Sequence, residues 1–290
     1  RDQPRSRGLG DVYKRQAYAV AEDPAVATPV MVNLDGFALT HTYETVDVPE
    51  PEEADAFLPP YRPAGNRFDF EHPVNIGFSA GPEYNRHFKY WEHRDMLDAP
   101  VVVERVEQRF AEVLERRYPG MIETLNCDDA DVILVTLGSA AGLVRSVVRQ
   151  LRDQGVRAGM LRIRYLRPMP SALIAEALRG AKAVGVLEKD VSFGAEGTVF
   201  TNVNSALQQA AAGVPTYNFV GGLGGDDISE AQVRGMYAML AQAAEGTGEL
   251  PRVSFLGIDS PADCHPERSA QRGAEGSRAE SAEALSERGR

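Results

Sequence analysis

The sequence is poor in cysteine, and this limits the metal chemistry that the chain offers. Cys127 and Cys264 lie far apart, so they provide neither a disulfide framework nor a CxxC metal knuckle. A [4Fe–4S] cluster takes four thiolates. We therefore expect any such cluster serving this protein to lie on another chain. The five histidines lack HExxH spacing, and we predict no metal site in this sequence.

The sequence also has fewer basic than acidic residues. Acidic residues outnumber Lys and Arg by 42 to 31, which gives a net charge of −11. Binding to nucleic acid phosphates needs concentrated positive charge, so we expect no nucleic acid partner. No apolar run approaches the roughly 20 residues of a membrane span, and the sequence does not open on an apolar signal segment. We expect a cytoplasmic protein with small-molecule and protein partners.

What the chain does have is enough apolar sequence for one large or two modest cores, since 43% of its 290 residues are hydrophobic. Composition divides it into four parts. Residues 1–16 have no hydrophobic period and are interpreted as a non-native leader. Residues 17–99 and 100–258 are the two folded segments. Residues 259–290 are rich in Ala, Glu, Arg, Ser and Gly, and we predict a disordered tail there.

The first folded segment contains one apolar run and one proline-rich stretch. The run Thr28 to Leu34 predicts a strand, and Asp35-Gly36 predicts a turn at its carboxyl end. The stretch from Val46 to Pro63 carries many prolines, which disfavour regular structure. We therefore predict a linker, or a segment that wraps over a surface, without helices or strands.

The second segment shows regular alternation of apolar runs and amphipathic stretches. Apolar spacing predicts a first helix at Val102–Tyr118. Strands are predicted at Val132–Leu137, Met160–Tyr165, Ala183–Leu187 and Thr216–Val220, and helices at Gly142–Arg152, Ser171–Leu178, Thr198–Ala211 and Ser229–Ala241. This order is typical of parallel βαβ units with helices on both faces of the sheet. The predicted fold class is therefore α/β.

In such sheets, ligands and partners gather at the carboxyl ends of the strands. One loop there, Gly138–Gly142, could place a phosphate at a helix N-terminus or be a plain tight turn, because Ala140 stands where a dinucleotide fingerprint needs glycine. A second loop contains Gly221, Gly222, Gly224, Gly225 and Asp226. It either approaches another surface closely or simply connects strand to helix.

Two further groups of polar residues are candidates for a direct role. Glu188, Lys189 and Asp190 end an apolar strand and form either a buried charge cluster or the cap of an exposed rim, and Gly194 and Gly197 lie in the loop that follows them. In the first segment, the candidates Asp35, Gly36, His41 and Glu44 follow the predicted strand. His41 could act in acid–base chemistry or be a hydrogen-bonded structural histidine.

Several of these stretches, taken together and in order, resemble the α chain of pyruvate:ferredoxin oxidoreductases and their branched-chain relatives. The stretches are Pro29–Glu44, Phe57–Tyr61, Tyr165–Pro168, Glu188–Asp190 and Gly221–Asp226. The resemblance runs from about residue 17 to residue 240. It implies that residues 17–99 are the end of a pyrimidine-type thiamine domain with its exit linker, and that residues 100–258 are a transketolase C-terminal-like domain.

The resemblance also implies an activity. Pyruvate and coenzyme A become acetyl-CoA and carbon dioxide on thiamine diphosphate, and the electrons pass to ferredoxin. It implies that a β-type subunit holds the diphosphate, its magnesium ion and the nearest iron–sulfur cluster, and that γ- and δ-type subunits complete the complex. The glutamate that activates the cofactor has no counterpart in this sequence. We therefore assign no catalytic residue and expect a structural role at the α–β interface.

Two alternatives stay open at the level of sequence. A 2-oxoacid dehydrogenase subunit or a transketolase relative would share the second segment but lack the Asp35–Glu44 run. A non-catalytic α/β assembly module would need no cofactor. Pyruvate and branched-chain 2-oxoacids are equally compatible with the sequence as substrates.

Overall fold

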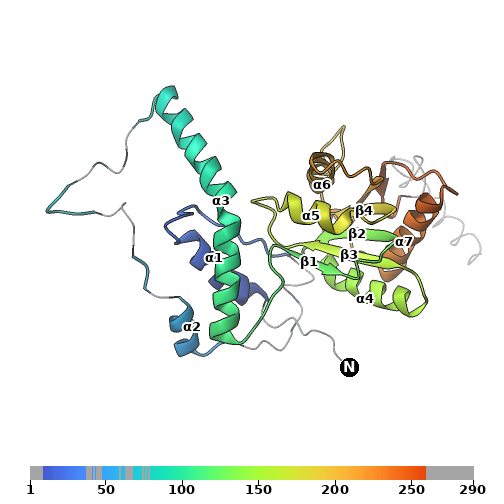
Figure 1. Ribbon diagram of the computed structural model, residues 1–290, viewed down its shortest axis with the longest axis horizontal. Coiled ribbons are helices and arrows are strands. Elements are labelled where there is room, and N and C mark those ends of the chain that lie inside the picture. The colour runs from blue at the N-terminus through green and yellow to red at the C-terminus, as the bar shows by residue number, and fades with distance from the viewer. Residues whose placement is uncertain are drawn as a thin grey trace, which may run out of the picture.

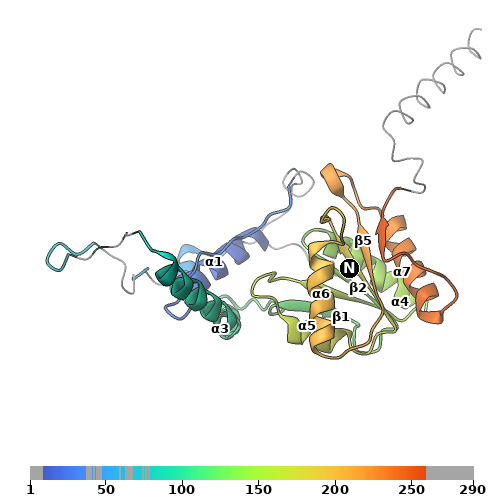
Figure 2. The same cartoon turned by 90° about the horizontal axis from the view of Figure 1, so that it is seen from above.

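The computed structural model describes residues 9–36, 41, 43, 48–58, 60–62, 68–73, 75, 77 and 79–258. These residues form a helical part and a sheet domain, which lie side by side in both views (Figures 1 and 2). The helical part consists of α1 (Leu9–Ala21), α2 (Pro51–Phe57) and α3 (Pro82–Leu114). The sheet domain follows from residue 121 onwards.

The sheet domain is built on six strands in the order β1-β3-β2-β4-β5-β6. Their bounds are β1 Ile122–Leu125, β2 Val132–Leu137, β3 Ala158–Ile163, β4 Ala183–Glu188, β5 Thr216–Val220 and β6 Val253–Phe255. β1 pairs antiparallel with β3, and the other neighbouring pairs are parallel. β2 and β4 are buried on both faces, which explains why both are continuous apolar runs in the sequence.

Helices cover both faces of this sheet. The bounds are α4 Ala140–Asp153, α5 Ser171–Leu178, α6 Thr198–Gln209 and α7 Glu230–Glu245, with a short 3₁₀ turn, η1, at Leu223–Gly225. α5 and α6 pack on one face with Ile133 and Val135 of β2. α4 and α7 pack on the other with Val132 and Leu134. The α/β fold class predicted from the sequence is confirmed.

A third apolar cluster holds the helical part together. The second half of α3 packs against α1 and α2 through Val102, Val106 and Phe110, with Phe57 of α2 edge-on to Phe110 at 5.0 Å between ring centroids. The first half of α3 extends past α1 (Figure 1). The helix predicted at 102–118 is therefore the end of a longer helix, and α3 stops at Leu114, four residues before the predicted end. Sequence periodicity found only the half with a buried face.

Two predictions for the first segment are wrong. Residues 28–34 form no strand, and Val30, Met31 and Leu34 are exposed. An apolar run makes a strand only where a neighbouring strand accepts its backbone hydrogen bonds, and this run has no such neighbour among the described residues. The proline-rich stretch, in turn, contains α2. Pro51 occupies the first turn of that helix, where no backbone N–H is needed, and Glu50 and Glu53 form a capping box.

The sequence-based domain boundaries fall inside helices. α1 crosses residue 16, and Gln16 is fully buried. α3 likewise crosses the division between residues 99 and 100. The helical part thus begins before the predicted first domain and ends after it, and the predicted tail at 259–290 lies outside the described residues.

A buried polar junction joins the two parts. Glu107 of α3 pairs with Arg164, just after β3, at 3.0 Å, and the two side chains are only 9% and 1% exposed. Gln16 of α1 donates a hydrogen bond to Glu107, and Arg164 also donates to the carbonyl of Gly120. Burial raises the pKa of Glu107, and Arg164 opposes that rise.

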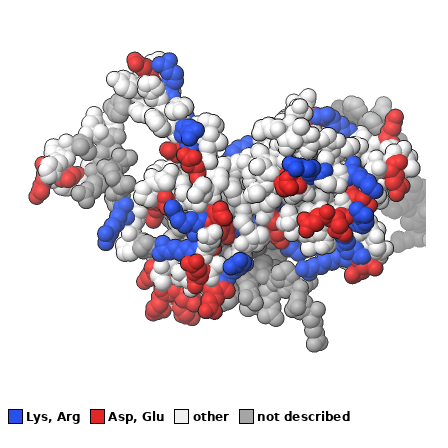
Figure 3. Space-filling view, viewed as in Figure 1, with Lys and Arg blue, Asp and Glu red and all other residues white. Residues whose placement is uncertain are grey.

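The surface agrees with the acidic composition. In the view of Figure 3, acidic side chains gather over α2, where Glu50, Glu52, Glu53 and Asp55 are exposed, whereas both signs of charge are mixed over the sheet domain. Within the described part of the chain, every helix is too short or too polar to span a membrane.

Candidate functional site

The sheet has a topological switch point between β2 and β4. The chain leaves β2 through α4 towards β3 on one side, and returns through α5 to β4 on the other side. In doubly wound sheets the crevice at the carboxyl ends of such a strand pair is the usual ligand position. Here Ser139 follows β2 and Lys189 follows β4, so both residues lie at this crevice.

The carboxylate of Asp35 sits at the switch point. It accepts a hydrogen bond from the hydroxyl of Ser139 and pairs with the Lys189 ammonium group at 3.0 Å. Lys189 also donates to Ser139 at 3.4 Å. The hydrogen bond from Ser139 is the main cause that holds the pKa of Asp35 below its ordinary value, with Lys189 contributing in the same direction. The segment after α1, which carries Asp35, thus contributes a negatively charged side chain to the surface of the sheet domain.

The glycine-rich loop after β5 borders this contact. A β-carbon at Gly222 would lie 3.0 Å from Cε of Lys189, and its φ of 70° is one that L residues rarely adopt. Glycine at this position lets the backbone pass close to the lysine stem. Gly221 is packed against Leu256, whereas a β-carbon at Gly224 or Gly225 would meet no atom within 4 Å. Asp226 accepts a hydrogen bond from the next backbone N–H within its own loop.

Glu188 is buried, whereas Lys189 and Asp190 are exposed, so the buried alternative from the sequence applies to Glu188 alone. Its carboxylate accepts hydrogen bonds from the backbone N–H groups of Val199 and Phe200, at the start of α6, and from the amide of Asn218 at 2.9 Å. Burial is the largest influence and raises its pKa, while these hydrogen bonds act against the rise. An anion at a helix N-terminus is electrostatically favourable. Glu188 therefore fixes α6 on the sheet.

Gly197 makes room for that carboxylate. A β-carbon here would overlap the Glu188 side chain, and the Gly197 N–H donates to Asn218 at 2.8 Å. Gly194 lies farther out, in a turn with φ of 83°, where a β-carbon would meet nothing within 4 Å. That turn presents Phe193, which is 99% exposed. Of the two glycine candidates in this loop, Gly197 is therefore required by packing and Gly194 by the turn.

The group Asp35, Gly36, His41 and Glu44 is only partly described. Asp35 reaches the sheet, a β-carbon at Gly36 would meet no atom within 4 Å, and His41 is exposed. Glu44 lies outside the described residues. Sequence analysis grouped Lys189 with Glu188 but did not predict its contact with Asp35, and it did not single out Ser139 or Asn218. Ser139 and Lys189 follow β2 and β4, and Asn218 lies within β5. These positions could have indicated that the three residues are candidates.

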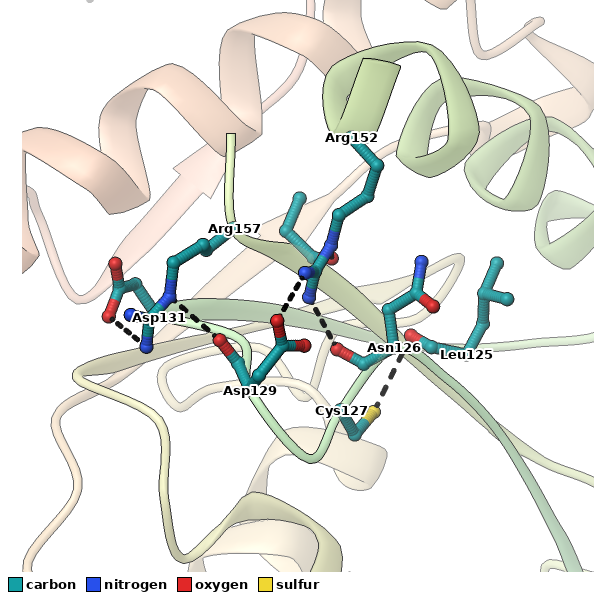
Figure 4. A network of polar contacts seen from close by, with 8 residues as sticks. Leu125, Asn126, Cys127, Asp129, Asp131, Arg152 and Arg157 are labelled. Atoms are coloured by element: carbon teal, nitrogen blue, oxygen red, sulfur yellow. Dashed lines mark hydrogen bonds and ion pairs between the residues drawn. The ribbon is translucent and has the colours of Figure 1, made fainter. Parts of the chain in front are cut away.

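The opposite, amino edge of the sheet holds a separate polar network (Figure 4). Arg152, in the last turn of α4, pairs with Asp129 and donates to the carbonyls of Asn126 and Ala158, and Arg157 pairs with Asp131. The Cys127 thiol donates to the Met160 carbonyl, and burial raises its pKa to about 11. These contacts tie the loop before β2 to α4 and leave Cys127 an unreactive thiol.

The described residues do not fit a metal or cluster. No group of three or more His, Cys, Asp or Glu side chains among them converges as a metal site would require, and Cys127 is a buried thiol. A hollow of about 510 Å³ lies beside Tyr217 and the loop 248–251. It is at the amino end of β5, away from the switch point. The lining of this hollow carries one carboxylate, Glu249.

Two family models match the chain in succession. Residues 12–108 match the thiamine diphosphate-binding domain of pyruvate flavodoxin/ferredoxin oxidoreductases, and residues 130–233 match core domain II of pyruvate:ferredoxin oxidoreductase. The chain belongs to the pyruvate:ferredoxin oxidoreductase family. Both matches follow the division seen in the structure, with the helical part in the first and the sheet domain in the second.

Curated members of the family give the same assignment. The chain is 38% identical to pyruvate synthase subunit PorA of Methanothermobacter thermautotrophicus over 217 residues, which is 75% of this chain and 55% of that protein. It is 36% identical to ketoisovalerate oxidoreductase subunit VorA of Pyrococcus abyssi over 236 residues, 81% of this chain and 59% of that protein. The chain thus spans little more than half the length of these relatives.

One solved structure in the comparison is a 2-oxoglutarate:ferredoxin oxidoreductase from Magnetococcus marinus. It is 17% identical, with a TM-score of 0.37, and the match covers 67% of this chain and 30% of that one. A likeness of this degree supports no statement about the site.

Proposed function

We propose that this chain is part of the α-type subunit of a 2-oxoacid:ferredoxin oxidoreductase, and that its described residues serve as scaffold and interface. The proposed reaction converts pyruvate and coenzyme A to acetyl-CoA and carbon dioxide, with electrons passing to ferredoxin. The observation that carries the proposal is the ordered match of both family models to the two parts that Asp35 and Glu107 join. We expect the complex to act in the cytoplasm.

The proposal assigns the chemistry to the complex. When bound, thiamine diphosphate would supply the electron sink for decarboxylation. The described residues lack a donor set for its metal, and we propose that a β-type subunit holds the magnesium ion and the iron–sulfur cluster. γ- and δ-type subunits complete the proposed assembly. The contribution of this chain is to hold the helical part against the sheet, through Asp35 at the switch point and through the Glu107–Arg164 pair.

Reduction of a viologen dye tests this function. The full-length α-type gene product that contains this sequence, co-expressed with the genes of its partner subunits, should co-purify with a thiamine-binding, cluster-bearing partner and reduce the dye only when a 2-oxoacid and coenzyme A are both present. Pyruvate and 2-oxoisovalerate are compared at equal concentration. Faster reduction with pyruvate supports the proposed substrate, and reduction with 2-oxoisovalerate alone would replace it.

A matched pair of variants tests the scaffold role. Asp35→Asn removes the charge at the switch point, and Asp98→Asn removes one exposed acid from α3. We expect Asp35→Asn to lower the yield of the assembled complex, while Asp98→Asn leaves it unchanged. Equal yields for both variants would contradict an interface role for the Asp35 contact, without bearing on the activity of the complex.

A further inference from the structure

A second polar cluster lies at the carboxyl ends of β2 and β3, on the face covered by α4. Thr136 and Arg162 are register partners in these parallel strands. Strand alternation puts both on the face of Leu134 and Met160, which pack against α4 and α7. β1 places Glu123 opposite Arg162, and α4 places Arg145 beside Glu123. Four elements thus bring two arginines, one acid and one hydroxyl together.

The two arginines share one carboxylate. Arg145 contacts Glu123 at 2.5 Å, and Arg162 contacts the other oxygen of the same carboxylate at 3.4 Å. The side chains of Glu123, Arg145 and Arg162 are 21%, 19% and 14% exposed. The three charged side chains therefore keep some contact with solvent. They are also buried enough that charge-assisted hydrogen bonds are stronger than at a fully exposed surface.

Two polar atoms of the cluster are unsatisfied. The hydroxyl of Thr136, which is 1% exposed, and Nε of Arg162 have no hydrogen-bond partner among the described residues. Buried polar groups in folded proteins nearly always have a partner. The cluster also carries two positive charges against one negative charge, which leaves it one positive charge in excess. Both the excess charge and the unused donors favour an anion.

We propose that Thr136, Arg145 and Arg162 form a binding site for a small anionic group, a phosphate or a carboxylate, and that Glu123 competes with this group for the two arginines. The planar guanidinium groups suit bidentate contacts to such oxygens. The site lies at the edge of the sheet where doubly wound folds collect their ligands. It is separate from the Asp35 contact, and the inference does not depend on the proposed function.

Anion titration of the full chain provides the test. Inorganic phosphate and acetate are titrated separately in Tris buffer, with chloride keeping the ionic strength constant, because surface charges respond to ionic strength alone. Isothermal calorimetry measures binding, and thermal unfolding measures the accompanying rise in Tm. We expect saturable binding of at least one of the two anions, and the tighter anion identifies the class of ligand.

Substitutions then locate the site. Arg162→Gln and Arg145→Gln should each weaken binding about tenfold or more, because each removes a charge-assisted hydrogen bond. Arg179→Gln, at an exposed position just after α5 on the opposite face of the sheet, makes the same charge change away from the cluster and should have no effect. Glu123→Gln should tighten binding, since it removes the competing carboxylate and keeps the side chain shape.

Thr136→Val separates ligand binding from a purely structural role. Without anion, the variant should have a higher Tm, because it removes a buried hydroxyl that lacks a partner. With anion, it should bind about threefold more weakly or worse. Absence of saturable binding in the unmodified chain would overturn the proposal. So would unchanged affinity in Arg162→Gln and Thr136→Val, or weaker binding in Glu123→Gln. If an arginine variant fails to fold, the Glu123 and Thr136 variants still decide the question.

Discussion

At the scale of single residues, the most informative side chain is Asp35. It comes from a segment without helix or strand, yet its carboxylate reaches the loops after β2 and β4. Nothing in the local sequence marks this contact. Ser139 and Lys189 are 104 and 154 residues farther along the chain. Sequence analysis placed Asp35 among the candidates, but only the folded sheet shows which groups it meets.

The ionisation of Asp35 gives a prediction about pH. Its pKa is lowered in the folded protein, so the carboxylate stabilises the fold above its ordinary pKa of 3.8, and this contribution is lost as the pH falls through the lowered value. Asp35→Asn should therefore be less stable than the unmodified chain at pH 6, and the difference should shrink below about pH 3.8. Urea unfolding at a series of pH values measures it. Asp98→Asn serves as the control, and a difference that is independent of pH would contradict the expectation.

At the scale of elements, α6 shows most clearly how one buried side chain fixes a helix on the sheet. Glu188 accepts hydrogen bonds from two N–H groups at the start of the helix, and Gly197 leaves the space that the carboxylate occupies. The backbone of Gly197 has φ −69°, which any L residue adopts. The need for glycine at this position is therefore a matter of space and not of backbone conformation.

The need for space at Gly197 can be measured by substitution. Gly197→Ala should destabilise the sheet domain by about 1–3 kcal/mol, because the added methyl group displaces the buried carboxylate. Gly213→Ala is the matched control, since a β-carbon there meets nothing within 4 Å. The free energy of unfolding from urea titrations should fall for the first variant and change little for the second. Equal values for the two variants would mean that Glu188 moves aside without cost.

The elements also show where sequence reasoning succeeds and where it fails. β2, β5 and α5 were predicted residue for residue, because the strands are short apolar runs, the helix has an apolar face, and all three have clear ends. β1 and β6 were missed, since they are short edge strands of 4 and 3 residues with partly exposed side chains. The false strand at 28–34 shows the complementary error. Apolar content predicts burial only where tertiary structure supplies a partner surface.

At the scale of the whole molecule, the Glu107–Arg164 pair links the helical part to the sheet domain inside a largely buried junction. Removing one member of a buried ion pair leaves the other charge without compensation, which costs more than the pair itself contributes. Glu107→Ala should thus destabilise the chain by about 3–5 kcal/mol. The double variant Glu107→Leu with Arg164→Met should be closer to the unmodified chain.

Urea unfolding followed by separate probes distinguishes local from global effects. Amide hydrogen exchange of residues 102–114 at each urea concentration reports on the packed half of α3, and far-ultraviolet circular dichroism reports on all the helices and strands. In Glu107→Ala, we expect the two transitions to separate, because the junction no longer couples the two parts. Arg105→Ala, which removes an exposed ion pair with Asp23, should leave them coincident. Coincident transitions in Glu107→Ala would show that other contacts maintain the coupling.

The Asp35 contact has a further consequence, for the order of events during synthesis. Asp35 leaves the ribosome long before Ser139 and Lys189, and those two residues become neighbours only after β2 and β4 have paired. The N-terminal segment must therefore wait, unanchored at this point, until more than 150 further residues have been made. At elongation rates of about 5–20 residues per second, that interval lasts on the order of ten seconds or more. The Asp35 contact therefore forms in a late step of biogenesis, after the Glu107–Arg164 pair has become possible.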